Sequence, residues 1–263
     1  MTNYSVAFND QQAGDRKVLT IKGVEYAFRW CPAGTFMMGS PANEAERVDD
    51  ETQHQVTLTR GFWMLETQVT QVMWEGVMGC NPSYFKGAKL PVETVSWYDC
   101  QEFIEQLNAH SAGTPGAPSG YRFSLPTEAQ WEYACRAGTT TPFNFGGVLN
   151  GDKANCDGDY PCGTSAKGRY LGETSEVGSY PANAWGLFDM HGNVWDWCLD
   201  WYGDYPSGAV TDPTGASSGS DRVLRGGCWS YAAGDCRSAV RGSYDPSSWD
   251  DHFGVRVSLV RAE

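Results

Sequence analysis

The chain has 263 residues, a formal net charge of −13 at pH 7, 41% hydrophobic residues and 19% charged residues. This composition excludes a disordered chain, and the negative charge argues against nucleic acid or an anionic membrane surface as the main partner. The sequence holds no apolar run of about 18 residues, so it predicts no membrane-spanning helix.

The first part of the chain predicts short strands and one helix. Alternating apolar residues over 18–39 predict two strands and a turn, and the acidic, polar residues 40–55 are typical of a loop. A further strand is expected over 56–65. Thr70 is the expected N-cap of a helix that Pro82 ends. One face of this helix holds four apolar residues: Met73, Trp74, Val77 and Met78.

Capping patterns predict two more helices. Ser96 caps the first, Ser96–His110, and Asp99 follows it at the spacing of a capping box. The second covers Thr127–Ala137, where Thr127 and Gln130 have the same spacing. Residues 139–183 are rich in Gly, Asn and Asp and predict a long irregular stretch.

Short strands are expected again at Val194–Leu199, Val223–Arg225 and Gly254–Val260. We therefore predict one α+β domain over residues 1–263, with little regular secondary structure and two or three helices. Between the apolar and basic ends of 222–257, which suggest two paired core strands, lies a run of Ser, Tyr, Asp, Gly, Trp and His without period. A core requires periodicity and a binding surface does not, so this middle is a candidate recognition surface.

The nine cysteines show no metal-type pairing. Cys156 and Cys162 share one loop and are a candidate disulfide. Residues 1–17 carry no export-signal pattern, so either the protein is cytoplasmic or its export signal lies outside this sequence.

Three phrases stand out together: LPTEAQWEY at Leu125–Tyr133, GLFDMHGNVWDW at Gly186–Trp197 and RVLRGGCW at Arg222–Trp229, with FGVRV closing the chain. Their combination resembles the formylglycine-generating-enzyme (sulfatase-modifying factor) superfamily over residues 25–260. The resemblance implies a C-type-lectin-like fold, with a small mixed antiparallel sheet.

The resemblance also bears on catalysis. Catalytic members oxidise a substrate cysteine with copper held by two thiols, placed four and nine residues after the Gly-Gly pair. Here these positions hold Tyr231 and Cys236, and Cys228 stands where the family usually has Ser. Monovalent copper requires two thiolates close together. We therefore expect no copper.

A calcium site is a further expectation from the family. Carried over onto DMHGNVWD, the resemblance implies calcium ligands at Asp189, Gly192, Val194 and Asp196, two through side chains and two through carbonyl groups. The alternative is a loop tied by hydrogen bonds without metal. The family's other calcium site, at Asn155 and Cys156 here, is expected to be lost or altered.

A more specific resemblance is to the variable proteins of diversity-generating retroelements, in which AAC-rich codons are copied with adenine replaced by any base. From Cys228 to His252 the chain contains no Lys, Glu, Gln or Met, which fits that rule in part, since an AAC codon cannot yield the Trp residues that are present. An ordinary family loop of similar composition is the alternative. The variable-region-like part is residues 228–252, here called the 228–252 segment.

Tyr and Trp suit binding because they offer rigid area, whereas Ser and Asp offer adaptable polar contacts. The candidate anchors are Tyr231, Tyr244 and Trp249, and we expect their joint replacement by Ala to leave the melting temperature almost unchanged. The candidate polar contacts are Ser230, Asp235, Ser243, Asp250, Asp251 and His252.

Two other sets of residues have structural interpretations. Four tryptophans are expected in the core: Trp131, Trp195, Trp197 and Trp201. Buried charge pairs that fix loops are expected among Glu128, Arg136, Arg225 and Arg241.

The leading hypothesis is a non-enzymatic protein that binds an unknown protein or surface ligand through a diversified face, at the cell surface. A lipid anchor outside this sequence would then be its only link to a membrane. One alternative is a copper-dependent oxidase of protein cysteine. Another is a maturation factor with one fixed partner.

Overall fold

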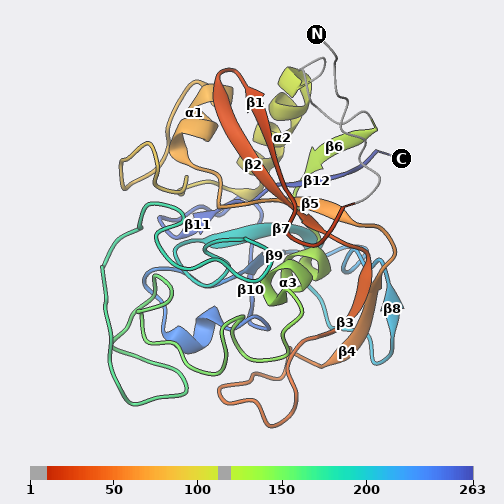
Figure 1. Cartoon of the computed structure of the whole chain (residues 1–263), viewed down its shortest axis with the longest axis vertical. Coiled ribbons are helices and arrows are strands. Elements are labelled where there is room, and N and C mark those ends of the chain that lie inside the picture. Colours follow the sequence, from red (N-terminus) through yellow and green to blue (C-terminus); the bar gives the residue numbers. More distant parts are fainter. Residues whose placement is uncertain (1–10, 112–119, 263) are drawn as a thin grey trace.

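The computed structural model describes residues 11–111 and 120–262. The described residues form three sheets and three α-helices, and long irregular segments run between these elements (Figure 1). A five-stranded sheet has the order β1 (Arg16–Ile21), β2 (Val24–Cys31), β5 (Phe62–Leu65), β12 (Ser258–Arg261) and β6 (Tyr121–Ser124). A four-stranded sheet has the order β10 (Arg241–Tyr244), β9 (Arg222–Arg225), β7 (Trp195–Trp201) and β11 (Phe253–Gly254). The third sheet comprises β3 (Gly34–Met38), β4 (His54–Leu58) and β8 (Val210–Thr211).

The helices begin where the capping residues predict. In α1 (Gln71–Met78), the Thr70 hydroxyl accepts a hydrogen bond from the Met73 amide. In α2 (Trp97–Ser111), the Ser96 hydroxyl accepts from the Asp99 amide and the Asp99 carboxylate accepts from the Ser96 amide. A complete capping box starts α3 (Glu128–Arg136). These reciprocal bonds satisfy amides that have no partner inside the helix.

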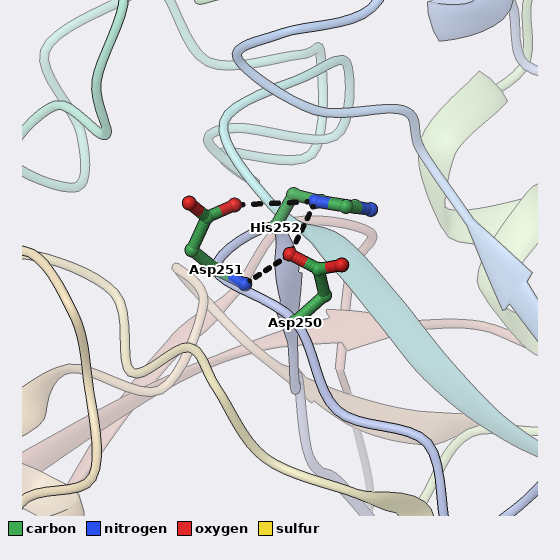
Figure 2. Close-up of side chains that lie close together, drawn as sticks. All are labelled: Asp250, Asp251 and His252. Carbon is green, nitrogen blue, oxygen red and sulfur yellow. Dashed lines mark hydrogen bonds and ion pairs between the residues drawn. The ribbon is translucent and has the colours of Figure 1, made fainter.

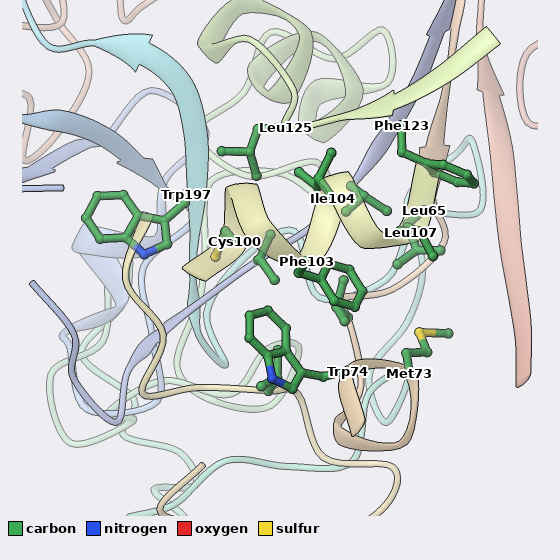
Figure 3. Close-up of a cluster of buried hydrophobic side chains, with 14 of the residues drawn as sticks. Leu65, Met73, Trp74, Cys100, Phe103, Ile104, Leu107, Phe123, Leu125 and Trp197 are labelled. Atoms are coloured by element: carbon green, nitrogen blue, oxygen red, sulfur yellow. The ribbon is translucent and has the colours of Figure 1, made fainter. Parts of the chain in front are cut away.

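The main core lies between α1, α2 and the five-stranded sheet. The buried face of α2 carries Cys100, Phe103, Ile104 and Leu107 (Figure 3). The ring of Trp74 stacks on Phe103 with centroids 4.8 Å apart. Trp197 is fully buried, and its indole nitrogen donates to the Val95 carbonyl at 3.0 Å. This bond satisfies the polar edge of Trp197, whereas the buried indole nitrogen of Trp74 has no hydrogen-bond partner among the described residues.

Several sequence expectations need correction. Helix α1 ends at Gly79 rather than at Pro82, because Gly79 adopts a left-handed conformation with φ of 76°. Residues 18–39 contribute three strands rather than two, and two strands, β4 and β5, replace the single strand expected over 56–65. The strand expected at Gly254–Val260 is divided into β11 and β12.

The irregular stretch is confirmed, because the chain between α3 and β7 contains neither helix nor strand over residues 137–194. In Figure 1 these green and teal loops surround the short 3-10 helix η1 (Ala233–Cys236). Among the described residues, no helix is long and apolar enough to cross a membrane. The expectation about an export signal falls largely on residues 1–10, which lie outside the described part.

Candidate functional site

The two ends of the 228–252 segment lead into strands that share one neighbour. Strand β9 pairs antiparallel with one side of β7, and β11 pairs parallel with its other side. The expected direct pairing of the two ends is therefore wrong, since β7 lies between them. Part of the segment itself forms β10, which pairs with β9 so that Arg241 lies opposite Arg225.

Buried ion pairs fix the base of the segment. The Arg225 guanidinium is fully buried, pairs with Glu132 and donates to the backbone carbonyls of residues 238–240. Arg241 donates to both carboxylate oxygens of Glu128, at 2.7 and 3.0 Å. Burial alone would raise the pKa of Glu128, but the guanidinium groups of Arg241 and Arg225 lower it. Arg136 pairs with Glu132 at 2.8 Å. The predicted buried charge pairs are confirmed.

Two further buried arginines, Arg237 and Arg256, were not predicted. Arg237 follows η1 and is buried, and it pairs with Glu44 at 2.6 Å and with Glu51 at 2.7 Å. It thereby fixes η1 to the loop before β4. More than 180 residues separate Arg237 from Glu51, so no local sequence signal identifies the pair.

Of the four tryptophans expected in the core, Trp131, Trp195 and Trp197 are buried. Trp201 is only half-buried, so that expectation is wrong in part. Its ring lies under the Arg222 guanidinium, 3.4 Å from the ring centroid. This geometry is a cation–π contact at the surface rather than core packing.

None of the nine candidate ligand contacts is buried. Several gather at the end of β11. The Tyr231 and His252 rings have centroids 5.8 Å apart, and Tyr244 packs on Phe253 at 4.7 Å. Figure 2 shows Asp250 and Asp251 directed towards His252 Nδ1, with oxygen–nitrogen distances of 3.1 and 3.3 Å. A charged and aromatic surface patch results.

The other candidates lie around this patch. Trp249 is 65% exposed in the loop before Asp250, and Ser243 lies on β10 opposite Val223. The Ser230 hydroxyl is 3.4 Å from the Cys228 sulfur. Asp235 lies in η1, where burial raises its pKa.

Sequence reasoning did not identify an aromatic neighbour of the patch. The Trp229 indole donates to the Asp251 carbonyl at 3.3 Å, and its ring meets Phe85 edge-on at 5.5 Å. Tyr84, which packs on Phe85, is 71% exposed. The loop after α1 therefore borders the face. The Tyr-Phe dipeptide alone gave no sign of this, because solitary aromatic pairs are common.

The thiols near the Gly-Gly pair are all buried. Burial raises the pKa of Cys228 to about 12, and the pKa of Cys236 is well above its ordinary value. These thiols are therefore protonated at neutral pH, whereas a thiolate is the form that binds metal or attacks a substrate. The candidate bridge between Cys156 and Cys162 is not formed, and both are free thiols.

The residues at the four expected calcium positions have protein partners. The Gln68 amide donates to the carbonyls of Val194 and Gly192 at 2.7 and 3.5 Å. Asp196 accepts from Trp131 and from Arg256, and the Asp189 carboxylate accepts from the Gly178 amide. These bonds take up both carbonyls and one oxygen of each carboxylate, whereas Asp196 Oδ1 is buried without a hydrogen-bond partner among the described residues. The hydrogen bonds favour the alternative of a loop tied without metal, and the calcium site stays a prediction.

We accordingly expect chelation to leave the fold unaffected. Adding EDTA, or millimolar calcium after EDTA, should shift the melting temperature by less than about 1 °C, because a ligand stabilises only what it binds. Thermal unfolding followed by circular dichroism checks this. Gln68→Ala is the comparison variant, because it removes the hydrogen bonds that tie the loop. It should lower the free energy of unfolding by about 1–3 kcal/mol, since it leaves buried carbonyls without a donor. A calcium-dependent rise in the melting temperature of several degrees would support the calcium site instead.

The anchors should differ in their effect on stability. Tyr231 is half-buried and packs edge-on against Trp195 at 5.8 Å, so Tyr231→Ala should lower the free energy of unfolding by about 1–3 kcal/mol. Trp249→Ala should cost less than about 0.5 kcal/mol, since the side chain is mostly exposed. Urea denaturation measures both. The expectation that joint replacement of all three anchors is nearly neutral is thus revised for Tyr231. Equal costs at both positions would contradict this assignment.

The three small sheets, the long irregular stretch and the irregular C-terminal face together are typical of a C-type-lectin-like domain. The chain belongs to the sulfatase-modifying factor enzyme 1-like domain family, whose profile matches residues 25–261. The family and α+β fold expected from the sequence are confirmed.

The similar proteins carry names that describe different functions. Formylglycine-generating enzyme of Streptomyces coelicolor is 36% identical, with 86% of this chain and 87% of that protein covered. Serine/threonine-protein kinase pkn1 of Chlamydia caviae is 35% identical over 70% of this chain, but the match spans only 26% of the kinase. The structure of Treponema denticola variable protein 1 superposes with a TM-score of 0.79 at 28% identity, covering 94% of this chain and 99% of that one.

Proposed function

We propose that this protein is a non-enzymatic ligand-binding protein that displays a diversified surface from residues 228–252. The observation that carries the proposal is Tyr231, which stands where the resemblance places a catalytic thiol. The remaining thiol of that pair, Cys236, is fully buried and protonated at neutral pH. The candidate contacts around Tyr231 are, in contrast, exposed or half-buried.

The distribution of buried and exposed residue types within the segment supports this proposal. Its arginines, Ser238 and most of its Ala and Gly residues are buried in the frame, and its Tyr, Asp, Trp and His side chains and its other Ser side chains reach the surface. Because the frame is stabilised by ion pairs to Glu128, Glu132 and Glu51, the surface side chains other than Tyr231 are expected to contribute little to folding. A rigid scaffold with variable loops is a common solution for recognition. Overall similarity to Treponema denticola variable protein 1 is in keeping with this use.

The experiment is a pair of displayed libraries. In the first, the nine candidate positions receive NNC codons, which mimic AAC with each adenine replaced by any base. In the second, four buried positions of the same segment receive them: Ala233, Cys236, Ala239 and Val240. Protease resistance of the displayed protein reports folding. We expect most members of the first library and few of the second to fold, and binders to unrelated purified proteins to emerge from the first alone.

Equal loss of folding in the two libraries would overturn the proposal. So would stoichiometric, thiol-dependent Cu(I) binding together with oxidation of a cysteine-containing peptide, which would favour the oxidase. The nucleotide sequence separates a diversified protein from a maturation factor with one fixed partner. A nearby reverse transcriptase gene, and a near-copy of codons 228–252 that differs at adenines, are expected only for the former.

Display at the cell surface is part of the same proposal, because a diversified face is useful where foreign ligands occur. An anchor outside this sequence would hold the protein there. Antibody labelling of intact cells, compared with permeabilised cells, tests this placement. Labelling only after permeabilisation would place the protein in the cytoplasm.

A further inference from the structure

Two buried thiols from distant parts of the chain meet beneath the 228–252 segment. Cys156 belongs to the irregular stretch 137–194, and Cys236 ends η1. Both are fully buried in one small apolar cluster, whose other members are Phe143, Leu149, Ala154, Cys162 and Ala233.

Backbone contacts place these two residues side by side. The Asp157 amide donates to the Tyr231 carbonyl at 2.8 Å, and Asp157 forms a parallel bridge with Ala232. The Ala233 amide donates to the Tyr160 carbonyl at 3.0 Å. Cys156 precedes this pairing and Cys236 follows it in η1, and both side chains lie in the one buried cluster at this junction. A hydrogen bond between their thiols is the largest cause of the raised pKa of Cys236.

The two other cysteines near Cys236 are Cys228 and Cys162, of which Cys162 lies in the same cluster. The Cys228 sulfur lies 3.4 Å from the Ser230 hydroxyl, towards the surface. Cys162 pairs through its backbone with Leu149. Gly227 has no side chain, and a Cβ there would lie 2.5 Å from the Cys236 sulfur. Cys236 is therefore packed closely on the Gly-Gly side, and Cys156 shares its buried cluster.

We propose that Cys156 and Cys236 form a disulfide under oxidising conditions, covalently joining the irregular stretch to the base of the 228–252 segment. The inference does not depend on the proposed function, since it rests on the frame alone. The bond would close a long loop of the chain, which is the situation in which a disulfide restricts the unfolded state most. It would also hold the face above it in one conformation before any ligand arrives.

The oxidant is a low-molecular-mass disulfide such as oxidised glutathione. The thiolate of one cysteine attacks a glutathione sulfur, forms a mixed disulfide and releases one glutathione thiolate, which takes up a proton. The second cysteine then attacks the protein sulfur of that mixed disulfide and releases the other glutathione. Two protein thiols are oxidised and one glutathione disulfide is reduced to two thiols. Because both thiols are fully buried in the folded protein, the exchange belongs to folding.

The test uses a Cys80→Ser variant, in which the exposed Cys80 cannot form mixed disulfides. The protein is unfolded, reduced, and refolded in a mixture of oxidised and reduced glutathione. Remaining thiols are alkylated under denaturing conditions, and peptides are mapped by mass spectrometry. We expect one cross-linked peptide pair, joining Cys156 to Cys236, and alkylation at the other cysteines. The melting temperature of the oxidised form should exceed that of the reduced form by about 5 °C or more.

Matched variants and kinetics complete the design. Cys156→Ala and Cys236→Ala should abolish the oxidation-dependent shift, whereas Cys162→Ala should retain it. Incubating the folded, reduced protein in the same mixture should give the bond at least about tenfold more slowly than refolding does. The proposal is overturned if all thiols are alkylated after refolding, or if the mapped bond joins Cys156 to Cys162 or Cys228 to Cys236. Disulfide mapping of the protein that carries Cys80→Ser alone identifies the bonded pair even where one of the alanine variants fails to fold.

Discussion

Arg225→Ala is expected to lower the free energy of unfolding by about 3–5 kcal/mol, the cost of removing one partner from a buried ion pair. Arg225 is fully buried between Glu132 and Glu128, and it also satisfies three backbone carbonyls at the base of the 228–252 segment. Its loss leaves Glu132 charged and buried with Arg136 alone. Equilibrium denaturation in urea measures the change.

Arg16→Ala is the control for this substitution. Arg16 pairs with Glu66 at 2.7 Å, but its side chain is 48% exposed, so its loss should cost less than about 1 kcal/mol. Adding Glu132→Gln to Arg225→Ala should recover part of the loss, because it removes the charge left without its partner. If Arg225→Ala proved no more costly than Arg16→Ala, the ion pairs would not be what holds the segment.

Gly227→Ala is the second change with a large expected effect, a loss of about 3 kcal/mol or more. Gly227 has φ of 73°, a left-handed conformation that costs an L-residue about 1–2 kcal/mol. An added Cβ would also lie 2.5 Å from the Cys236 sulfur and 2.9 Å from the Asp235 carbonyl oxygen. Since both neighbours are fixed by η1, the packing cannot relax cheaply.

Gly79→Ala separates these two contributions. Gly79 has nearly the same φ, 76°, but a Cβ there would meet no atom within 4 Å among the described residues. The free energy of unfolding of this variant should therefore fall only by the conformational contribution, about 1 kcal/mol. Thermal and urea unfolding of the two variants give the difference. Equal losses would mean that the close approach of Cys236 carries no energetic weight.

The helices and frame strands were predictable because their signals are local. Thr70, Ser96 and Thr127 cap their helices through residues three positions away, and such spacing is visible in sequence. Strand β10 was not predicted, because Arg241–Tyr244 contains no apolar alternation. Its strand conformation comes from pairing with β9, which is a tertiary effect.

The candidate site was predictable as a region rather than in detail. Composition identified the 228–252 segment, and the exposed Trp249 and Tyr244 were among its anchors. Composition did not show that Tyr231 packs against Trp195, nor that Trp229 reaches Phe85. The shared buried cluster of Cys156 and Cys236 was equally invisible, since it depends on how an irregular stretch packs on η1.

The loop between β10 and β11 is held at two points. The Pro246 carbonyl accepts a hydrogen bond from the Trp97 amide at 3.1 Å, and the Asp250 carbonyl accepts from the Thr94 amide at 2.9 Å. Between them, Ser247–Trp249 spans a short gap at the surface, whereas β10 is in register with β9 and β11 with β7. Residues inserted or deleted in this gap would leave both registers unchanged. The scaffold therefore accommodates differences in length as well as in residue type, so related copies can present loops of unequal reach on one frame.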